Sequence, residues 1–341
     1  VAAARRRWRR AFADRTTIHA PEPTWYEGTD VLVHPGVAHV VRIAPITTET
    51  CQRRCTAFVI GSGYTGVMSL YPLLIAQTLS RRGYVCYIVE YPGYGRAGGS
   101  AERITIADQR TAFDSAARVA RHDLATLVAP RRAGVIVGIA WAMGALGLFE
   151  AAAAQPATGP LYDAVVSVNG LLSAPSVQQH VLQHLADNQL SVEQLQREVA
   201  EVQRRRPEVT VDVPPLAYDD FAAHVREMED DELYGAFEGY PLDLETTRVV
   251  LRDLVAHGDW QCARVHGAFF KELLEKDVSS LATGLAATPI LLVHGRSNML
   301  HSARHVEDVA LHLRSAPGRT APCDLLFVDA RHNDFMSHDD V

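Results

Sequence analysis

Residues 135–147 come nearest to a catalytic motif in their residue types and spacing. They read Val-Ile-Val-Gly-Ile-Ala-Trp-Ala-Met-Gly-Ala-Leu-Gly, an apolar run followed by small residues. This pattern is typical of a buried strand that turns sharply into a helix, the setting in which the motif G-x-S-x-G presents a nucleophilic serine. Ala142 stands at the serine position and Ala140 at that of the first glycine. The segment therefore has the frame of a nucleophile elbow without the hydroxyl group.

A glycine-rich loop is the second segment that could do chemistry. It reads Gly61-Ser62-Gly63-Tyr64-Thr65-Gly66 and follows an apolar run. Its G-x-G-x-x-G spacing, with Glu90 closing the next apolar run, fits a dinucleotide-binding loop. In that fold the helix starts within the glycine motif, which would place Pro72 inside the helix at a cost of about 3 kcal/mol. If the helix starts near Tyr71 instead, Pro72 lies in its first turn, where the missing N–H costs nothing. The sequence favours the longer loop, and dinucleotide binding stays as an alternative.

The elements that must position these segments alternate between buried-strand and helical patterns. Such alternation is typical of an α/β fold with a mostly parallel sheet and helices on both faces. An antiparallel pair is expected around residues 31–43. Parallel strands are expected at 57–60, 84–89, 134–139, 164–168, 289–293 and 324–328, and helices from about 71 and at 105–120, 142–154 and 303–313. Residues 1–170 and 286–341 are predicted to form this core.

Residues 171–285 differ from the rest of the chain in composition. They are charged and helical in pattern, and no buried-strand pattern occurs in them. Ser191-Val192-Glu193-Gln194 fits the capping box at the start of a helix. We therefore expect an inserted helical cap, or lid. An insertion at this point would cover the carboxyl ends of the strands, where ligands bind in open α/β folds.

Five short motifs, in this order, resemble those of the α/β-hydrolase superfamily, most closely those of its esterase-like members with a helical cap. Residues 62–66 resemble the loop H-G-x-x-G with serine in place of histidine, residues 91–100 the turn D-x-R-G-x-G-x-S-x-G, residues 140–144 the nucleophile elbow, residues 294–298 the motif H-G-x-x-D, and residues 330–335 the final histidine segment. Each motif is weak alone, but their common order favours the resemblance. It implies an α/β-hydrolase fold and leaves the cap unmatched.

The resemblance implies a triad in which the nucleophile, acid and base positions hold Ala142, Asn298 and His332. In an acyl-transfer triad a hydroxyl attacks the carbonyl, a histidine takes its proton, and a carboxylate orients the imidazole and stabilises its charge. Ala142 cannot attack, and Asn298 can orient His332 without stabilising its charge. Asp329 or Asp334 could replace the missing carboxylate.

The resemblance also implies an oxyanion hole made of the backbone N–H groups of Tyr64 and Met143, which side-chain replacement leaves in place. Substrate contacts are expected from Gly63, Thr65 and Trp141. The expected site therefore has backbone donors for a carbonyl oxygen and also has a base, but it lacks a nucleophile.

Three functions fit such a site. The first is an α/β-hydrolase-fold enzyme that acts on a small acyl- or ester-bearing molecule, for instance in secondary metabolism, with alanine at the nucleophile position. The second is a lyase in which His332 removes a proton and a carboxylate such as acetate leaves without a covalent intermediate. The third is a non-catalytic receptor for a small molecule, although a receptor needs neither a base nor an oxyanion hole. The sequence slightly favours the first.

Composition narrows the range of partners. The chain has 341 residues, a net charge of −7 and five cysteines. The negative charge gives no general attraction to nucleic acids, and an odd number of cysteines without paired spacing argues against a metal or redox site. No apolar run approaches the roughly 18 residues that span a bilayer. We expect a cytoplasmic protein with a small-molecule substrate and with no cofactor, metal, nucleic-acid or membrane partner, and a homodimer stays open.

Two histidine pairs have the spacing of metal ligands on a helix. They are His180-x-x-x-His184 and His301-x-x-x-His305. Neither pair has a glutamate or a third ligand beside it. We therefore expect both pairs on exposed helix faces.

Overall fold

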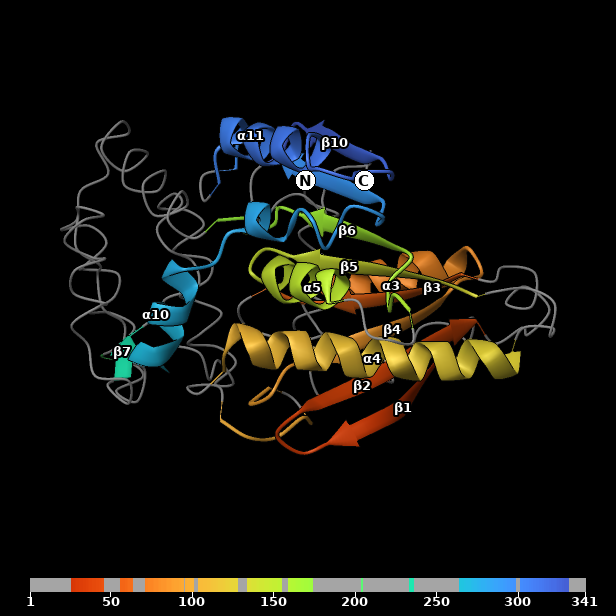
Figure 1. Cartoon of the computed structure of the whole chain (residues 1–341). Helices are drawn as coiled ribbons and strands as arrows, with labels where there is room; N and C mark the ends of the chain where they lie inside the picture. Colours follow the sequence, from red (N-terminus) through yellow and green to blue (C-terminus); the bar gives the residue numbers. More distant parts are fainter. Residues whose placement is uncertain are drawn as a thin grey trace.

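One large sheet flanked by helices organises the chain (Figure 1). The computed structural model describes residues 26–45, 56–63, 71–94, 96–100, 104–127, 134–154, 159–173, 204, 233–235, 264–298 and 301–330. Within these ranges eight strands form the sheet in the order β1-β2-β4-β3-β5-β6-β9-β10. They are β1 (Tyr26–His34), β2 (Ala38–Pro45), β3 (Thr56–Gly61), β4 (Val85–Glu90), β5 (Val135–Trp141), β6 (Ala164–Val168), β9 (Ile290–Gly295) and β10 (Cys323–Val328). A separate antiparallel pair consists of β7 (Leu233–Gly235) and β8 (Arg264–His266).

Antiparallel pairing is confined to one edge of the large sheet. β1 pairs with β2 and β2 with β4 in antiparallel register, whereas the pairs from β4 through to β10 are parallel. The predicted antiparallel pair around residues 31–43 and the predicted parallel strands are therefore confirmed. All six residues of β4 are buried, as expected for a strand covered on both faces. The predicted α/β class is confirmed.

Helices cover both faces of the sheet. Alternate residues of β4 belong to different apolar clusters, Val85 and Tyr87 to the larger one and Cys86 and Ile88 to the smaller one. Because successive side chains of a strand point to opposite faces, the two clusters lie on opposite sides of the sheet. The helix α3 (Tyr71–Arg81) contributes to the smaller cluster. The larger cluster receives α4 (Ile106–Leu127), α5 (Gly144–Ala153) and α11 (Ala303–Arg314).

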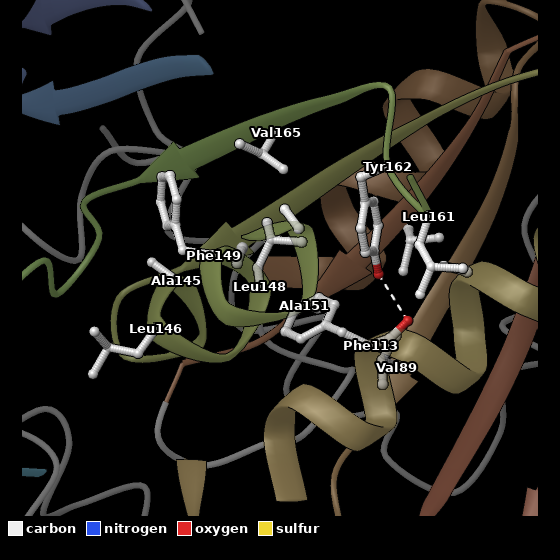
Figure 2. Packing of buried hydrophobic residues seen from close by; sticks show 14 of the residues in the cluster. Val89, Phe113, Ala145, Leu146, Leu148, Phe149, Ala151, Leu161, Tyr162 and Val165 are labelled. Carbon is white, nitrogen blue, oxygen red and sulfur yellow. Dashed lines mark hydrogen bonds between the residues drawn. The ribbon is translucent and has the colours of Figure 1, made fainter. Parts of the chain in front are cut away.

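The larger cluster packs tightly where α5 meets α4 (Figure 2). The Tyr162 hydroxyl donates to the Phe113 carbonyl of α4 at 2.8 Å, which ties the segment before β6 to this helix. A Cβ atom at Gly147 would lie 2.6 Å from the Cβ of Gln109, so only glycine lets the two helices approach this closely. This packing fixes the first turns of α5 against α4.

The predicted helix starts have different outcomes. α3 begins at Tyr71 as predicted, and Pro72 therefore lies in its first turn. The helix expected from Ala142 begins at Gly144 instead. The reason is local, because Ala142 has a φ of 45° and cannot be part of a right-handed helix.

The expectation that His301 lies on an exposed helix face is wrong. His301 is 2% exposed and precedes Ser302, the N-cap of α11. Its N–H donates to the side-chain oxygen of Asn298 at 3.3 Å. His305 is partly buried, and His180 and His184 lie outside the described residues.

The predicted cap lies mostly outside the described residues. Its described end contains β8, α10 (Gly267–Leu274) and the 3₁₀ helix η3 (Val278–Leu281). The Val278 N–H donates to the Leu172 carbonyl at 2.8 Å, and Val278 and Leu285 are buried in the larger cluster. The domain boundaries at residues 171 and 285 stay a prediction. No helix in the described ranges has both the length and the apolar character to cross a bilayer.

Candidate active site

The turn between β5 and α5 holds Ala142 in a conformation that alanine rarely adopts. Its φ is 45°, and Asn169 is the other non-glycine residue with a positive φ in the part of the chain that the structure describes. Such a conformation costs about 1 to 3 kcal/mol and persists only where the surroundings impose it. The Ala142 N–H donates to the Val168 carbonyl at 3.1 Å. The Ala142 carbonyl accepts from the N–H groups of Leu171 at 2.8 Å and Ala145 at 3.1 Å.

The loop after β3 lies directly against this turn. A Cβ atom at Gly144 would lie 2.0 Å from the Ser62 carbonyl oxygen and 2.6 Å from the Tyr91 hydroxyl. The elbow therefore needs glycine at this position, which the motif supplies. Gly63, predicted to contact substrate, is buried and is the last described residue of that loop. The structure thus brings Ser62, the residue before Gly63, against the elbow.

The elbow leads into the N-terminus of α5. The N-cap residue Met143 makes no side-chain cap hydrogen bond. The N–H groups of Ala145 and Leu146 donate to the carbonyls of Ala142 and Met143 at 3.1 Å each. The N–H groups of Met143 and Gly144 precede these donors and lie at the N-terminal end of α5. This end of the helix dipole carries about half a positive elementary charge. Backbone donors at such an end can stabilise an oxyanion that develops on a bound carbonyl.

The other predicted site residues fall into two groups. Trp141 ends β5 and is 2% exposed, packed in the smaller apolar cluster with Ile60 and Val168. The predicted base His332 and the loop residues Tyr64 and Thr65 lie outside the described residues. Asp334 also lies outside them, and Asp329 is exposed just after β10.

Two buried amides occupy the carboxyl ends of β6 and β9. Asn298, at the predicted acid position, is 4% exposed, and its side-chain oxygen accepts from the His301 N–H at 3.3 Å. Asn169 follows β6, and its side-chain oxygen accepts from the Gly295 N–H at 2.8 Å. Its own N–H donates to the Val293 carbonyl at 2.8 Å. An amide carries no charge at any pH of interest, so both positions orient neighbouring groups without providing an anion.

Sequence reasoning missed Asn169, although a signal was present. The residue stands between a buried strand and Gly170, and asparagine is enriched at positive φ. A Cβ atom at Gly170 would lie 1.9 Å from the Ser167 hydroxyl oxygen, so this turn is as tightly packed as the elbow. The Asn-Gly pair after a strand therefore marked a special backbone position.

His294 has a structural role at the end of β9. It is 1% exposed, and its Nε2 atom lies 3.0 Å from the His301 carbonyl oxygen. A carbonyl can only accept, so Nε2 carries the proton in this hydrogen bond. This hydrogen bond ties the end of β9 to the residue before the N-cap of α11.

A group of four charged or titratable residues lies at the end of β4, with His39 and Glu90 buried and Asp30 and Arg96 exposed. The Glu90 carboxylate accepts from His39 Nδ1 at 2.6 Å and from the Arg96 N–H at 3.1 Å. The other ring nitrogen of His39 lies 3.1 Å from Asp30 Oδ1, and the Arg96 guanidinium donates to the same aspartate. Sequence reasoning considered Glu90 only as part of a dinucleotide-binding pattern. Its carboxylate is instead engaged by His39, which counts against the dinucleotide alternative.

The protonation of His39 follows from its two partners. Burial alone would lower the pKa of His39, but the hydrogen bonds and charges of Glu90 and Asp30 outweigh it and raise the pKa. Both ring nitrogens face carboxylates, which only accept when ionised, so the ring must donate twice and is an imidazolium. This ion pair joins the β1–β2 hairpin to the end of β4.

Taken together, the contacts place the start of α5, with its backbone N–H groups, against the loop after β3. In the described ranges, no group of three histidine, cysteine or carboxylate side chains is placed to hold a metal ion. The final histidine segment, in which the base is predicted, lies outside the described residues except for Ala330.

Comparisons with known proteins identify similar structures at low sequence identity. The chain is similar to a hypothetical protein from Pseudomonas aeruginosa, with a TM-score of 0.60 and 17% identity over 95% of this chain and 93% of that one. It is also similar to the α/β hydrolase GrgF from Penicillium sp., with a TM-score of 0.57 and 13% identity over 92% and 93%. A monoacylglycerol lipase from Paleococcus ferrophilus gives a TM-score of 0.53 and 12% identity over 91% of each chain. No protein-family model matches the chain, and no curated protein gives a significant match.

Proposed function

Because the chain has the α/β-hydrolase fold, we propose that it is an enzyme acting on a small molecule that carries an acyl or ester group. The observation that carries this proposal is the backbone at Ala142, held at a φ of 45° directly before α5. An alanine side chain gains nothing from this conformation, which costs about 1 to 3 kcal/mol. Strained backbone of this kind clusters at active sites, ligand clamps and switch regions.

The similar structures support an ester as the substrate class. The Paleococcus protein is a monoacylglycerol lipase. A Pyrococcus furiosus protein, similar with a TM-score of 0.52 and 12% identity over 92% of this chain and 86% of that one, is an esterase. A receptor would need neither the strained elbow nor backbone donors beside it. Both considerations favour acyl chemistry over simple binding.

The proposed chemistry begins with the carbonyl oxygen of the substrate. It would accept hydrogen bonds from the backbone N–H groups of Tyr64 and of Met143, the N-cap residue of α5, and these donors would stabilise negative charge as it develops. His332 would act as the base, oriented by the uncharged side chain of Asn298. Ala142 offers only a methyl group, so no acyl-enzyme can form at this residue.

The substitution Ala142→Ser tests the site directly. Serine would place a hydroxyl group on a backbone already held in the elbow conformation, so we expect a burst of about one equivalent of chromophore per chain from a short-chain p-nitrophenyl ester. Ala142→Gly is the matched control, because it relaxes the backbone without adding a nucleophile and should give no burst. If the serine variant is folded and shows neither burst nor turnover, the elbow or the base is misassigned.

The methyl group of Ala142 favours a second candidate function, elimination without a covalent intermediate. His332 would remove a proton from the carbon next to the one that bears the ester oxygen. That electron pair forms a carbon–carbon double bond as the alkyl C–O bond breaks, and the carboxylate leaves with the bonding electrons. The oxyanion hole would hold the leaving carboxylate. No hydroxyl nucleophile takes part, which suits the chain as it stands.

A reaction in ¹⁸O-labelled water distinguishes the two functions. Hydrolysis breaks the acyl C–O bond and brings solvent oxygen into the released carboxylate, whereas elimination breaks the alkyl C–O bond and brings none. His332→Ala should slow either reaction by roughly 10² to 10⁴. His312→Ala is the control, because His312 is exposed on α11. Label in the carboxylate contradicts elimination, and full activity of His332→Ala contradicts the assignment of the base.

A further inference from the structure

The hydroxyl group of Tyr91 fills the space between the loop after β3 and the start of α5. Tyr91 follows β4 directly and is 0% exposed. Its hydroxyl donates to the Ser62 carbonyl oxygen at 2.8 Å. A Cβ atom at Gly61 or at Gly144 would lie 2.6 Å from this same hydroxyl oxygen. One phenol oxygen thus separates the last residue of β3 from the first residue of α5.

The hydrogen bond to Ser62 fixes more than one carbonyl group. The peptide unit that joins Ser62 to Gly63 is planar, so the direction of the Ser62 carbonyl also sets the direction of the Gly63 N–H. The chain then continues from this oriented unit to Tyr64. On the other side, the Ser62 carbonyl oxygen occupies the space of the missing Cβ of Gly144, next to Met143. The hydroxyl of Tyr91 is therefore connected to both segments that the proposed oxyanion hole requires.

The ring and the protonation state of Tyr91 suit a permanent donor. The ring packs beside Phe113, with 5.9 Å between the ring centroids and an interplanar angle of 56°. Burial raises the pKa of Tyr91 far above its usual range, so the hydroxyl stays protonated and can always donate. The direction of the donor is fixed by the rigid ring, because a phenol hydroxyl lies close to the ring plane.

We propose that Tyr91 is a positioning residue of the candidate active site, whose hydroxyl sets the spacing between the loop after β3, at Ser62 and Gly63, and the start of α5 beside Met143. The inference rests on the proposed function for its chemical consequence. Oxyanion donors act at 2.7 to 3.1 Å from the charge that they stabilise, and a misplacement of about 1 Å can cost about 10²-fold. Loss of the spacer should therefore weaken stabilisation of an oxyanion more than binding of a neutral ester.

Tyr91→Phe tests this role, and Tyr162→Phe is its matched control. Both substitutions keep a buried ring and remove one hydroxyl that donates to a backbone carbonyl at 2.8 Å within the larger apolar cluster. A purely structural role predicts similar effects of the two substitutions. The Tyr162 hydroxyl bonds to the Phe113 carbonyl in α4 (Figure 2) and not to a carbonyl of the loop after β3.

The first measurement is amide hydrogen exchange by mass spectrometry, which needs no ligand. In Tyr91→Phe we expect exchange at least about tenfold faster in peptides that contain Gly63 and in peptides that contain Met143, because the spacer that holds the two segments is weakened. In Tyr162→Phe these peptides should exchange as in the natural chain. Equal acceleration in both variants, or none in Tyr91→Phe, overturns the proposal.

The second measurement is calorimetric binding of a short-chain alkyl phosphonate monoester, which mimics an oxyanion, and of the matching neutral ester. Tyr91→Phe should weaken phosphonate binding by up to about 10²-fold and ester binding by less than about threefold. Equal losses for both ligands overturn the positioning role. If the natural chain itself does not prefer the phosphonate, the proposed function fails, and hydrogen exchange still decides whether Tyr91 holds the loop and the elbow together.

Discussion

The contact between Gly144 and the Ser62 carbonyl predicts a large effect of a small substitution, Gly144→Ala. The new Cβ would lie 2.0 Å from the Ser62 carbonyl oxygen, 1.0 Å short of the 3.0 Å that such atoms keep, and 2.6 Å from the Tyr91 hydroxyl. The carbonyl belongs to the backbone and cannot rotate away as a side chain does. The loop after β3 must therefore move as a unit, away from the elbow.

The expected cost can be worked out from these contacts. Overpacking in a tightly packed region costs about 1 to 3 kcal/mol. If the loop moves, the hydrogen bond from Tyr91 to Ser62 is lost as well, at about 1 kcal/mol. Alanine has a higher helix propensity than glycine and returns at most about 1 kcal/mol. We expect Gly144→Ala to lower the free energy of unfolding by about 2 kcal/mol.

Equilibrium unfolding in urea measures the loss in free energy of unfolding. A double-mutant cycle with Tyr91→Phe then tests how much of this loss comes from the contact with the Tyr91 hydroxyl. Gly144→Ala should cost less in the Tyr91→Phe background, because one of its two obstacles is then absent. Gly147→Ala is the control in the same helix, since its Cβ would meet Gln109 at 2.6 Å rather than Tyr91. Its cost should be the same in both backgrounds. If Gly144→Ala unfolds at the same urea concentration as the natural chain, the described contact between loop and elbow is wrong.

Three further predictions concern buried polar groups. Asn169→Ala deprives the Gly295 N–H of its acceptor and should lower the free energy of unfolding, measured in urea, by about 2 kcal/mol. Asn169→Gly relaxes the positive φ and should lower it by less. Equal losses in the two variants would mean that the positive φ of Asn169 is unstrained. The pKa of His39 is raised above its ordinary value of 6.5, so its contribution to folding is full below pH 6.5 and is lost as the pH rises through the folded-state pKa. The natural chain should therefore lose its stability advantage over His39→Gln at alkaline pH, and parallel pH profiles of the two proteins would contradict the ion pair. Asn298→Asp, added to Ala142→Ser, should raise the esterase rate by up to about 10⁴ through a stabilised imidazolium; an unchanged pH–rate profile would mean that another carboxylate already serves His332.

Local rules were enough to predict most of the fold. The strand at 164–168 has its predicted bounds in β6, and Pro72 placed the start of α3 at Tyr71. The α/β-hydrolase fold that the five ordered motifs imply is confirmed. The start of α5 was predicted two residues too early, because helical propensity does not reveal that tertiary contacts hold Ala142 at a positive φ. Such a backbone state depends on neighbours that are distant in sequence.

The polar surroundings of the site were less predictable for the same reason. His39 and Glu90 are 51 residues apart and meet because β2 pairs with β4 in that register. Nothing in the local sequence of either residue indicates the other. The burial of His301 likewise depends on the chain turning back on Asn298 before α11. The assignments of Tyr64, Thr65 and His332 stay predictions from the motifs.

The backbone at Ala142 also bears on how easily this position could gain or lose a serine by mutation. Every alanine codon differs from a serine codon by a single base, so the side chain that the elbow lacks is one mutation away. In most folds a new nucleophile would also require a rebuilt turn around it. Here Ala142 is already held at a φ of 45° by three hydrogen bonds, one that its N–H donates to the Val168 carbonyl and two that its carbonyl accepts from the N–H groups of Leu171 and Ala145. A serine that arose at this position would therefore find the backbone turn already in place.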